Sequence, residues 1–242
     1  MFQGIAVLCF IMTWTMGFLY ADVVKSIQIS VDGVTGQEHE AVQKALEISN
    51  DLIKEEVVDE QWLKRMERQG PQRIREVLEP FGYYKPDVTV KLEASDEGSY
   101  RFLVTVKTGE PVRIKAIQVI AQGPGTSEDT IQKMIDEFPL RIGGRLRQDI
   151  YEEAKNNLLK KAISIGYLDA AYSKHSIRIT LSQLSAEIDL ILETGSKYYF
   201  GDISFTDQTG FPEPFLTRYL AFKRGEVYSQ DLNEERYTRR KR

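Results

Sequence analysis

The sequence predicts an α+β protein made of tandem β-α-α-β-β modules, each a three-stranded mixed sheet covered by two helices. Two observations lead to this prediction. The chain repeats itself at a nearly constant interval, and each repeat alternates between the apolar spacing of strands and that of helices. Of its 242 residues, 42% are hydrophobic and 28% are charged, which is typical of folded soluble domains.

Glycines in three matching contexts define the repeat: one opens a strand, one lies in a loop before a long helix, and one ends that helix. The matching pairs are Gly109 and Gly195 (195 − 109 = 86), Gly143 and Gly225 (225 − 143 = 82), and Gly82 and Gly166 (166 − 82 = 84). The three offsets agree on a unit of about 84 residues, so the chain holds two complete units and the start of a third.

The first unit is predicted to run from an opening strand through two helices to a closing hairpin. Pro71 is expected to kink or split the second helix, because proline lacks the amide donor and its ring clashes with the preceding turn. The expected elements are strand Val24–Val31, helix Glu38–Ile48, helix Asp59–Phe81, and strands Asp87–Leu92 and Tyr100–Thr108.

The second unit has the clearer periodicity. Apolar residues recur every three or four positions in its long helix and at every second position in its closing strands. Thr126 or Ser127 is the expected N-cap of its short helix, and Gly166 the expected C-cap of its long one. The expected elements are strand 112–121, helix Thr126–Phe138, loop Arg141–Arg147, helix Gln148–Ile165, and strands Ala171–Leu181 and Ala186–Thr194.

The third unit begins near Lys197 with the same strand, short helix and loop, and stops early in its second helix. An incomplete module cannot bury its sheet, so we expect residues 196–242 to be poorly ordered by themselves. The sequence therefore predicts a fragment of a longer protein.

The first 21 residues carry no charge, and the stretch from Ile5 to Phe18 is almost wholly apolar. This length suits a signal peptide cleaved after Ala21; an uncleaved membrane anchor is the alternative. Cys9, the single cysteine, lies inside this segment, so the mature chain is expected to have no disulfide and no thiol nucleophile.

The rest of the chain offers little for catalysis or metal binding. Its two histidines, His39 and His175, cannot build a zinc site of ordinary spacing and are expected to be structural or solvated. The segment 123–125 (Gly-Pro-Gly) lacks the Lys-Ser/Thr of a phosphate loop and is interpreted as a strand-to-helix turn. A net charge of −4 disfavours nucleic-acid binding. We predict no catalytic residue, no metal ligand, no cofactor and no nucleic-acid partner.

The order, length and tandem repetition of these units, behind an export signal, resemble the POTRA-domain arrays of the BamA/TamA outer-membrane assembly superfamily. The helix-ending Gly-Tyr-Tyr/Leu at 82–84 and 166–168 and the strand-opening Gly-x-x-x-x-Ile/Phe at 109–114 and 195–200 are similar to that family's hallmarks. The resemblance covers about residues 22–242 and is greatest to the periplasmic part of TamA-type members.

The resemblance implies three modules: residues 22–108, residues 109–194 and an incomplete third at 195–242. Family members continue into a membrane β-barrel, which this sequence does not contain. The residues that mark the modules are Gly82, Tyr83, Gly109, Gly166, Tyr167, Gly195 and Gly225. Tyr83, Tyr84 and Tyr167 are expected to pack on the module cores rather than to bind a partner.

The resemblance also implies a function. The chain would be a non-enzymatic scaffold in the periplasm, at the outer membrane, that guides unfolded outer-membrane proteins. Its first module would dock a TamB-like protein anchored in the inner membrane.

Three other functions stay open. One is the POTRA region of a BamA-like or two-partner-secretion transporter. Another is a secreted enzyme or small-ligand binder with a site between modules. The third is an envelope or division protein that uses one module behind an uncleaved anchor.

Physically, the feature most able to bind a client is the edge of each sheet, because unpaired backbone groups there accept an added strand. By resemblance, the strand after the second helix lies at that edge. The alternative is that charges such as Lys91 and Lys174, or a neighbouring module, close these edges. The candidate client-binding residues are Val88, Val90, Leu92, Ile177, Ile179 and Leu181.

Overall fold

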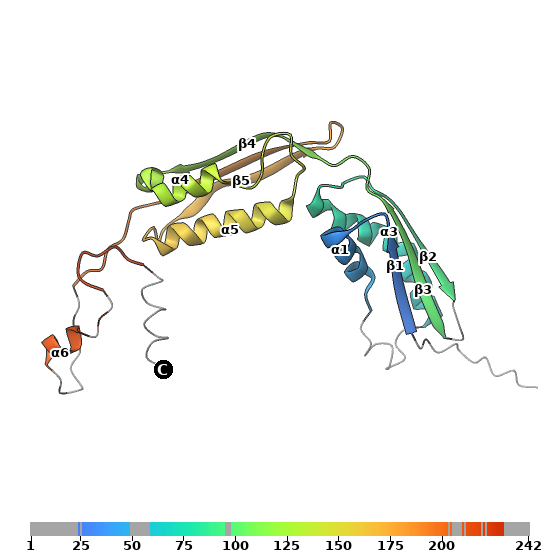
Figure 1. Ribbon diagram of the computed structural model, residues 1–242, viewed down its shortest axis with the longest axis horizontal. Coiled ribbons are helices and arrows are strands. Elements are labelled where there is room, and N and C mark those ends of the chain that lie inside the picture. The colour runs from blue at the N-terminus through green and yellow to red at the C-terminus, as the bar shows by residue number, and fades with distance from the viewer. Residues whose placement is uncertain are drawn as a thin grey trace, which may run out of the picture.

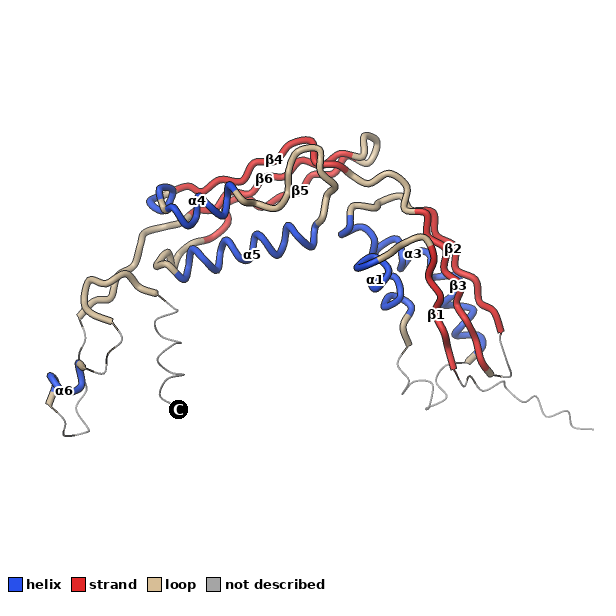
Figure 2. The backbone as a smooth tube through the Cα atoms, in the orientation of Figure 1, coloured by secondary structure: helices blue, strands red, loops and turns tan. Residues whose placement is uncertain are grey.

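The computed structural model describes residues 24, 26–48, 59–94, 98–202, 204, 210, 212–218, 220 and 222–229. Two modules of the same topology follow each other along the chain, each with a sheet on one side and helices on the other (Figure 1). In Figure 2 the helices of both modules lie on the inner side of the bend that the modules form together.

The first module contains a three-stranded mixed sheet in the order β1-β3-β2. Strand β1 runs parallel to β3, and β2 runs antiparallel to it, so β1 and β2 are the two edges. Its elements are β1 (Ser26–Asp32), α1 (Gly36–Leu46), α3 (Glu60–Leu78), a 3-10 turn (Glu79–Phe81), β2 (Asp87–Ala94) and β3 (Ser99–Lys107).

The core of the first module lies between its sheet and its helices. Phe102 on the central strand is fully buried, and so are Leu63 and Ile74 on α3. Gly70 lets α3 lie close to the sheet, since a Cβ there would be 3.1 Å from Cγ2 of Val90.

Helix α3 is one continuous helix, so the expected split at Pro71 is wrong. The proline removes one hydrogen bond, while the apolar face of the 19-residue helix stays packed on the core on both sides of it. The helix also ends earlier than expected, and its last turn tightens into the 3-10 turn.

The second module repeats this arrangement, with sheet order β4-β6-β5. Strand β4 is parallel and β5 antiparallel to the central β6. Its elements are β4 (Arg113–Gln122), a 3-10 turn (Pro124–Ser127), α4 (Asp129–Asp136), α5 (Gln148–Ser164), β5 (Ala171–Thr180) and β6 (Ser185–Glu193). The predicted α+β class with β-α-α-β-β modules is confirmed.

The short helix of this module starts later than its sequence predicted. Neither Thr126 nor Ser127 caps it, because both belong to the 3-10 turn, and Glu128 is the residue before α4. The hydroxyl of Thr126 donates to the carbonyl of Gly123 at 2.7 Å and so stabilises the turn instead of the helix. The interpretation of 123–125 as a strand-to-helix turn is confirmed.

The described part of the third unit is small. The expected strand near Lys197 is present only as a bridge between Tyr199 and Val227, and the short helix as α6 (Glu213–Thr217). Phe200 and Phe222 stack with ring centroids 3.8 Å apart. The predicted signal segment 1–21 and the beginning of the unit's second helix lie outside the described residues.

The described residues contain neither a membrane-spanning helix nor a cluster of metal-binding side chains. No helix in this part of the chain is long and apolar enough to cross a membrane. Among the same residues there is no group of three or more His, Cys, Asp or Glu side chains that would hold a metal ion.

Candidate strand-binding edges and the module joints

Both strands that were expected at the sheet edges do lie there. Strand β2 pairs only with β3, and strand β5 pairs only with β6, so each has one side to which no strand of the described chain is bonded. An edge of this kind presents backbone N–H and C=O groups to an extended peptide.

The backbone of β2 shows which of its groups face the open side. The N–H of Leu92 donates to Oε1 of Glu67 on α3 at 2.8 Å, and not to β3. Leu92 lies opposite Phe102 in an antiparallel ladder without register shifts, in which every second residue turns its N–H and C=O away from the partner strand. Val88 and Val90 therefore turn both groups toward the open side, as Leu92 does.

The side chains of these residues hold β2 on the helices. Val88 and Val90 are 6% and 7% exposed, and Leu92 packs partly buried against the same core. The apolar side chains thus fix the strand in place, while the backbone groups of the same residues point outward in the plane of the sheet.

Strand β5 is a less regular edge. Ile177 and Ile179 pack partly buried on the second core, but the register shifts between Tyr172 and Lys174. A bulge of this kind bends an edge and makes it a poorer template for another strand.

The expectation that Leu181 belongs to β5 is wrong. The strand ends at Thr180, and Leu181 lies in the turn after it, 43% exposed. Its carbonyl accepts a hydrogen bond from Nζ of Lys85 at 3.1 Å, which ties this turn to the end of the first module.

The lysines that were considered as edge blockers project from the sheet faces. Nζ of Lys174 is 2.7 Å from a carboxylate oxygen of Asp189 on β6, so the side chain points inward across the sheet. Lys91 lines a shallow hollow with Thr89 and Glu93 on the outer face of the first sheet. Neither charge occupies the outward backbone groups of its strand.

Strand β4 is the contrasting edge, because a loop covers its beginning. The N–H of Ile114 donates to the carbonyl of Gly144 at 2.9 Å, and the N–H of Gly143 donates to the carbonyl of Ile114 at 2.8 Å. Leu146 N–H likewise donates to the carbonyl of Val112. These bonds use the outward groups at the start of β4.

The same loop joins the second module to the first. The N–H of Val112 donates to the carbonyl of Gly82 at 2.8 Å, which places the end of the first module's helix against β4. Gly82 has φ +89°, and a Cβ there would be 2.4 Å from the carbonyl oxygen of Leu146. Only glycine fits this joint without displacing the backbone.

Side chains reinforce the joint from both modules. Nη1 of Arg145 donates to the hydroxyl of Tyr83 at 2.6 Å, and Nη2 is 2.9 Å from the carboxylate of Glu38 on α1. Arg147 donates to Gln37 at 2.6 Å and lies over the ring of Phe81. The Arg145–Glu38 pair is mostly buried, at 28% and 16% exposure, which strengthens the attraction between the charges compared with a fully exposed pair.

Tyr84 crosses the joint. Its ring packs on the core of the second module, and its hydroxyl accepts a hydrogen bond from Gln148. Burial raises the pKa of Tyr84, so the hydroxyl stays neutral at physiological pH. The expectation that Tyr84 packs on a core is confirmed, although the core is that of the next module.

The joint between the second module and the third unit repeats these bonds. Tyr198 N–H donates to the carbonyl of Gly166 at 2.8 Å, and Tyr228 N–H donates to the carbonyl of Tyr198 at 3.0 Å. A Cβ on Gly166 would be 2.9 Å from Cγ1 of Val227. Gly166, Tyr198 and Tyr228 take the places that Gly82, Val112 and Leu146 have at the first joint. They follow those residues by 84, 86 and 82 positions, which are the offsets of the sequence repeat.

The remaining marker glycines have matching places as well. Gly109 has φ +67° beside the carbonyl of Lys85, and Gly195 has φ +66° beside Asp169, 84 residues after Lys85. Gly225 N–H donates to the carbonyl of Phe200 at 2.8 Å, as Gly143 does to Ile114 in the second module.

Tyr167 packs on its module core as expected, at 2% exposure, and its hydroxyl donates to Glu128 at 3.0 Å. Burial, followed by this bond to a carboxylate, raises the pKa of Tyr167 to about 12. Glu128 also pairs with Lys197 at 2.5 Å, and the hydrogen bond from Lys197 lowers the pKa of Glu128. This pair links α4 to the start of the third unit.

Sequence reasoning missed the charged side chains that hold the edge and the joints, among them Glu67, Arg145 and Arg147. Glu67 is one of many charged residues on α3, so nothing in the sequence distinguishes it. Arg145 aligns with Val227 in the third unit, so the repeat carries no signal for it.

The comparison with protein families decides what the first module is. Residues 28–108 match the family model described as POTRA domain TamA domain 1. The first module is a POTRA domain. The predicted resemblance is thus confirmed for this module, and the second module has the same strand and helix order.

Solved structures of parts of BamA and Omp85 are similar to the chain at low identity. BamA POTRA3–5 from Haemophilus influenzae is 16% identical, covers 90% of this chain and 85% of its own, and has a TM-score of 0.45. The N-terminal domain of Omp85 from Thermosynechococcus elongatus is 13% identical, with coverages of 88% and 82% and a TM-score of 0.33. POTRA1–3 of the periplasmic domain of Omp85 from Anabaena is 16% identical, with coverages of 90% and 83% and a TM-score of 0.31.

Proposed function

We propose that the chain is the periplasmic part of an outer-membrane protein assembly factor and acts as a scaffold rather than as an enzyme. Its modules would be residues 22–108, 109–194 and 195 onward, behind a signal peptide. A TamB-like inner-membrane-anchored protein is the proposed partner of the first module, and unfolded outer-membrane proteins are the proposed clients. The POTRA match of residues 28–108 and the apolar N-terminal segment support this proposal.

The single observation that carries the proposed mechanism is the open backbone of β2. Val88 and Val90 turn two N–H and two C=O groups outward, and β-strand addition uses such groups. At about 0.5–1.5 kcal/mol per hydrogen bond, four bonds contribute on the order of 2–6 kcal/mol, so one edge binds weakly and with little dependence on side chains.

The joints make such weak edges useful. The bonds at Gly82 and Gly166 fix each unit against the next, so the edges of successive modules keep a set spacing. A client that reaches two edges then binds more tightly than to either alone, because the second contact is intramolecular.

Replacing Val90 with proline tests strand addition at β2. Proline removes the outward N–H of Val90 and leaves the β2–β3 ladder intact, since that N–H does not point toward β3. The matched control is Val90→Ala, which loses the valine side chain and keeps the N–H. The expected result is at least about fivefold weaker binding by Val90→Pro than by Val90→Ala, because one hydrogen bond is worth about 1 kcal/mol.

Binding is measured by fluorescence anisotropy with the full chain and a labelled eight-residue peptide of alternating Val and Thr. Circular dichroism confirms that both variants are folded. Equal affinities of the two variants would show that the β2 backbone does not bind the peptide.

A further inference from the structure

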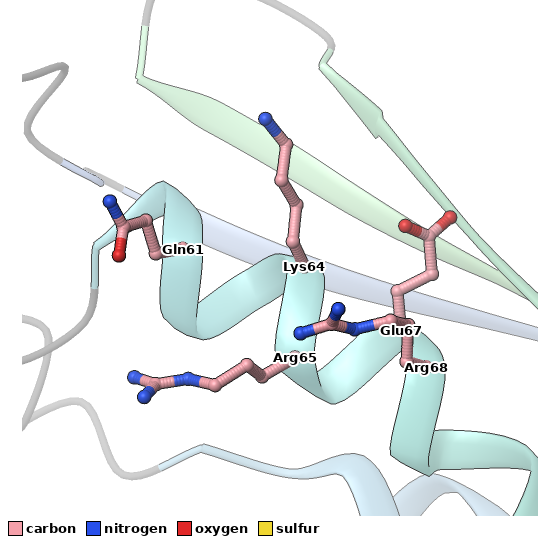
Figure 3. A pocket seen from close by; sticks show the side chains of 5 residues that line it. All are labelled: Gln61, Lys64, Arg65, Glu67 and Arg68. Carbon is pink, nitrogen blue, oxygen red and sulfur yellow. The ribbon is translucent and has the colours of Figure 1, made fainter.

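A charged hollow lies on α3 next to the end of β2. It has a volume of about 480 Å³. The residues that line it are Gln61, Lys64, Arg65, Glu67 and Arg68 (Figure 3). One of them, Glu67, is the residue that holds the N–H of Leu92 at the open edge, so the hollow and the edge adjoin each other.

The side chains that line this hollow come from successive turns of α3. In Figure 3, Lys64 and Glu67 extend from α3 toward the strands of the first sheet, and Arg65 points away from them. Lys64 also lies near Tyr100, the partner of Ala94 at the end of β2. Its pKa is raised mainly by Glu60, with smaller contributions from Tyr100 and Glu67, so Lys64 is positive at physiological pH.

The charge of the hollow is opposite in sign to that of the chain. Its lining carries three cations and one carboxylate, whereas the chain has a net charge of −4. Lys64 pairs with Glu60 at 2.6 Å, but within the described part of the chain neither Arg65 nor Arg68 forms a salt bridge. Exposed cations beside a strand edge favour a ligand with negative charges.

Glu67 also blocks the end of the edge. A strand that pairs with β2 beyond Val90 must take the N–H of Leu92 from the Glu67 carboxylate. When Glu67 is displaced, Lys64 loses a nearby negative charge, and carboxylates on the incoming strand replace it. A basic strand would instead place its charges beside three cations.

We propose that the first module selects an extended segment with acidic side chains, which pairs with β2 while its carboxylates contact Lys64 and Arg68. The inference rests on the proposed strand addition at β2 and names the chemical class of the segment. Exposed ion pairs are individually weak, so we expect two or three of them together to change the affinity by about tenfold.

The test compares two labelled eight-residue peptides, one of alternating Val and Asp and one of alternating Val and Lys, by anisotropy with the full chain. The Asp peptide is expected to bind about tenfold more tightly at low salt, with a smaller difference at high salt. The double variant Lys64→Glu/Arg68→Glu is expected to reverse the preference. The control is Lys115→Glu/Lys160→Glu, which makes the same change in net charge at exposed positions of the second module. This control variant is expected to keep the preference for the Asp peptide.

Two results would overturn the inference. One is equal binding of the two peptides. The other is an equal change of preference in the control variant, which would mean that only net charge matters.

Val90→Pro separates this inference from the proposed function. If Val90→Pro weakens the binding of both peptides and the wild-type chain prefers neither peptide, strand addition stands and acidic selection fails. If Val90→Pro weakens the binding of neither peptide, strand addition fails.

A membrane surface is the other anionic ligand that a basic helix can bind. Sedimentation with vesicles of equal parts phosphatidylglycerol and phosphatidylcholine measures this. Vesicle binding that is lost in Lys64→Glu/Arg68→Glu, together with no preference between the peptides, would assign the surface to lipid and contradict the proposal.

Discussion

Gly82→Ala is expected to separate the first module from the second and to lower the free energy of unfolding by about 3–4 kcal/mol. Gly82 has φ +89°, and its new Cβ would lie 2.4 Å from the carbonyl oxygen of Leu146. Because that oxygen is backbone, the clash is relieved only if the joint opens, which breaks the bond from Val112 to Gly82. The contacts of Arg145 with Glu38 and Tyr83 would weaken with it.

Gly143→Ala is the control, because Gly143 has a similar φ of +82° and nothing within 4 Å of a Cβ. Gly143→Ala is expected to lower the free energy of unfolding by only about 1–2 kcal/mol, which is the cost of placing alanine in a left-handed backbone conformation. Urea unfolding measures both stabilities, and small-angle scattering measures whether the modules keep one arrangement. Equal destabilisation, with unchanged scattering for Gly82→Ala, would mean that the Gly82–Leu146 contact does not fix the joint.

Gly33→Ala is expected to unfold the first module, with a loss of more than about 3 kcal/mol. Gly33 follows β1 with φ +94°, and a Cβ there would be 1.9 Å from the carbonyl oxygen of Val106 on the central strand. Neither backbone can move without breaking the sheet or shifting α1.

Gly36→Ala, three residues later, is the matched control. Gly36 has φ +60° and nothing within 4 Å of a Cβ, so we expect a loss of about 1–2 kcal/mol. Thermal unfolding followed by circular dichroism measures both variants. NMR spectra are expected to lose the signals of the first module in Gly33→Ala and to keep those of β4, β5 and β6. A Gly33→Ala protein as stable as Gly36→Ala would contradict the close approach of this turn to β3.

The repeat made much of this architecture predictable. The offsets of 86, 84 and 82 residues recur as hydrogen bonds at the two joints, where Gly82 and Gly166 lie close to the backbone of the next unit. The family resemblance placed β2 and β5 at the edges correctly. The alternation of apolar residues predicted one buried face, and Val88 and Val90 are buried.

Contacts between distant residues were not predictable. The bond from Leu92 to Glu67 joins residues 25 positions apart, and that from Arg145 to Tyr83 joins residues 62 apart. Which of many charged side chains meets such a partner depends on how the modules pack. The continuous helix through Pro71 has the same origin, because tertiary packing outweighed the local preference of proline.

Amide hydrogen exchange at the β2 edge tests the central claim most directly. The N–H groups of Thr89 and Lys91 bond to β3 and are expected to exchange slowly in the free protein, whereas those of Val88 and Val90 exchange faster. Saturation of the full chain with the Val–Asp peptide is expected to slow exchange at Val88 and Val90 by at least about tenfold, because an added strand protects outward amides. Unchanged exchange at both residues while the peptide is bound would contradict strand addition at this edge.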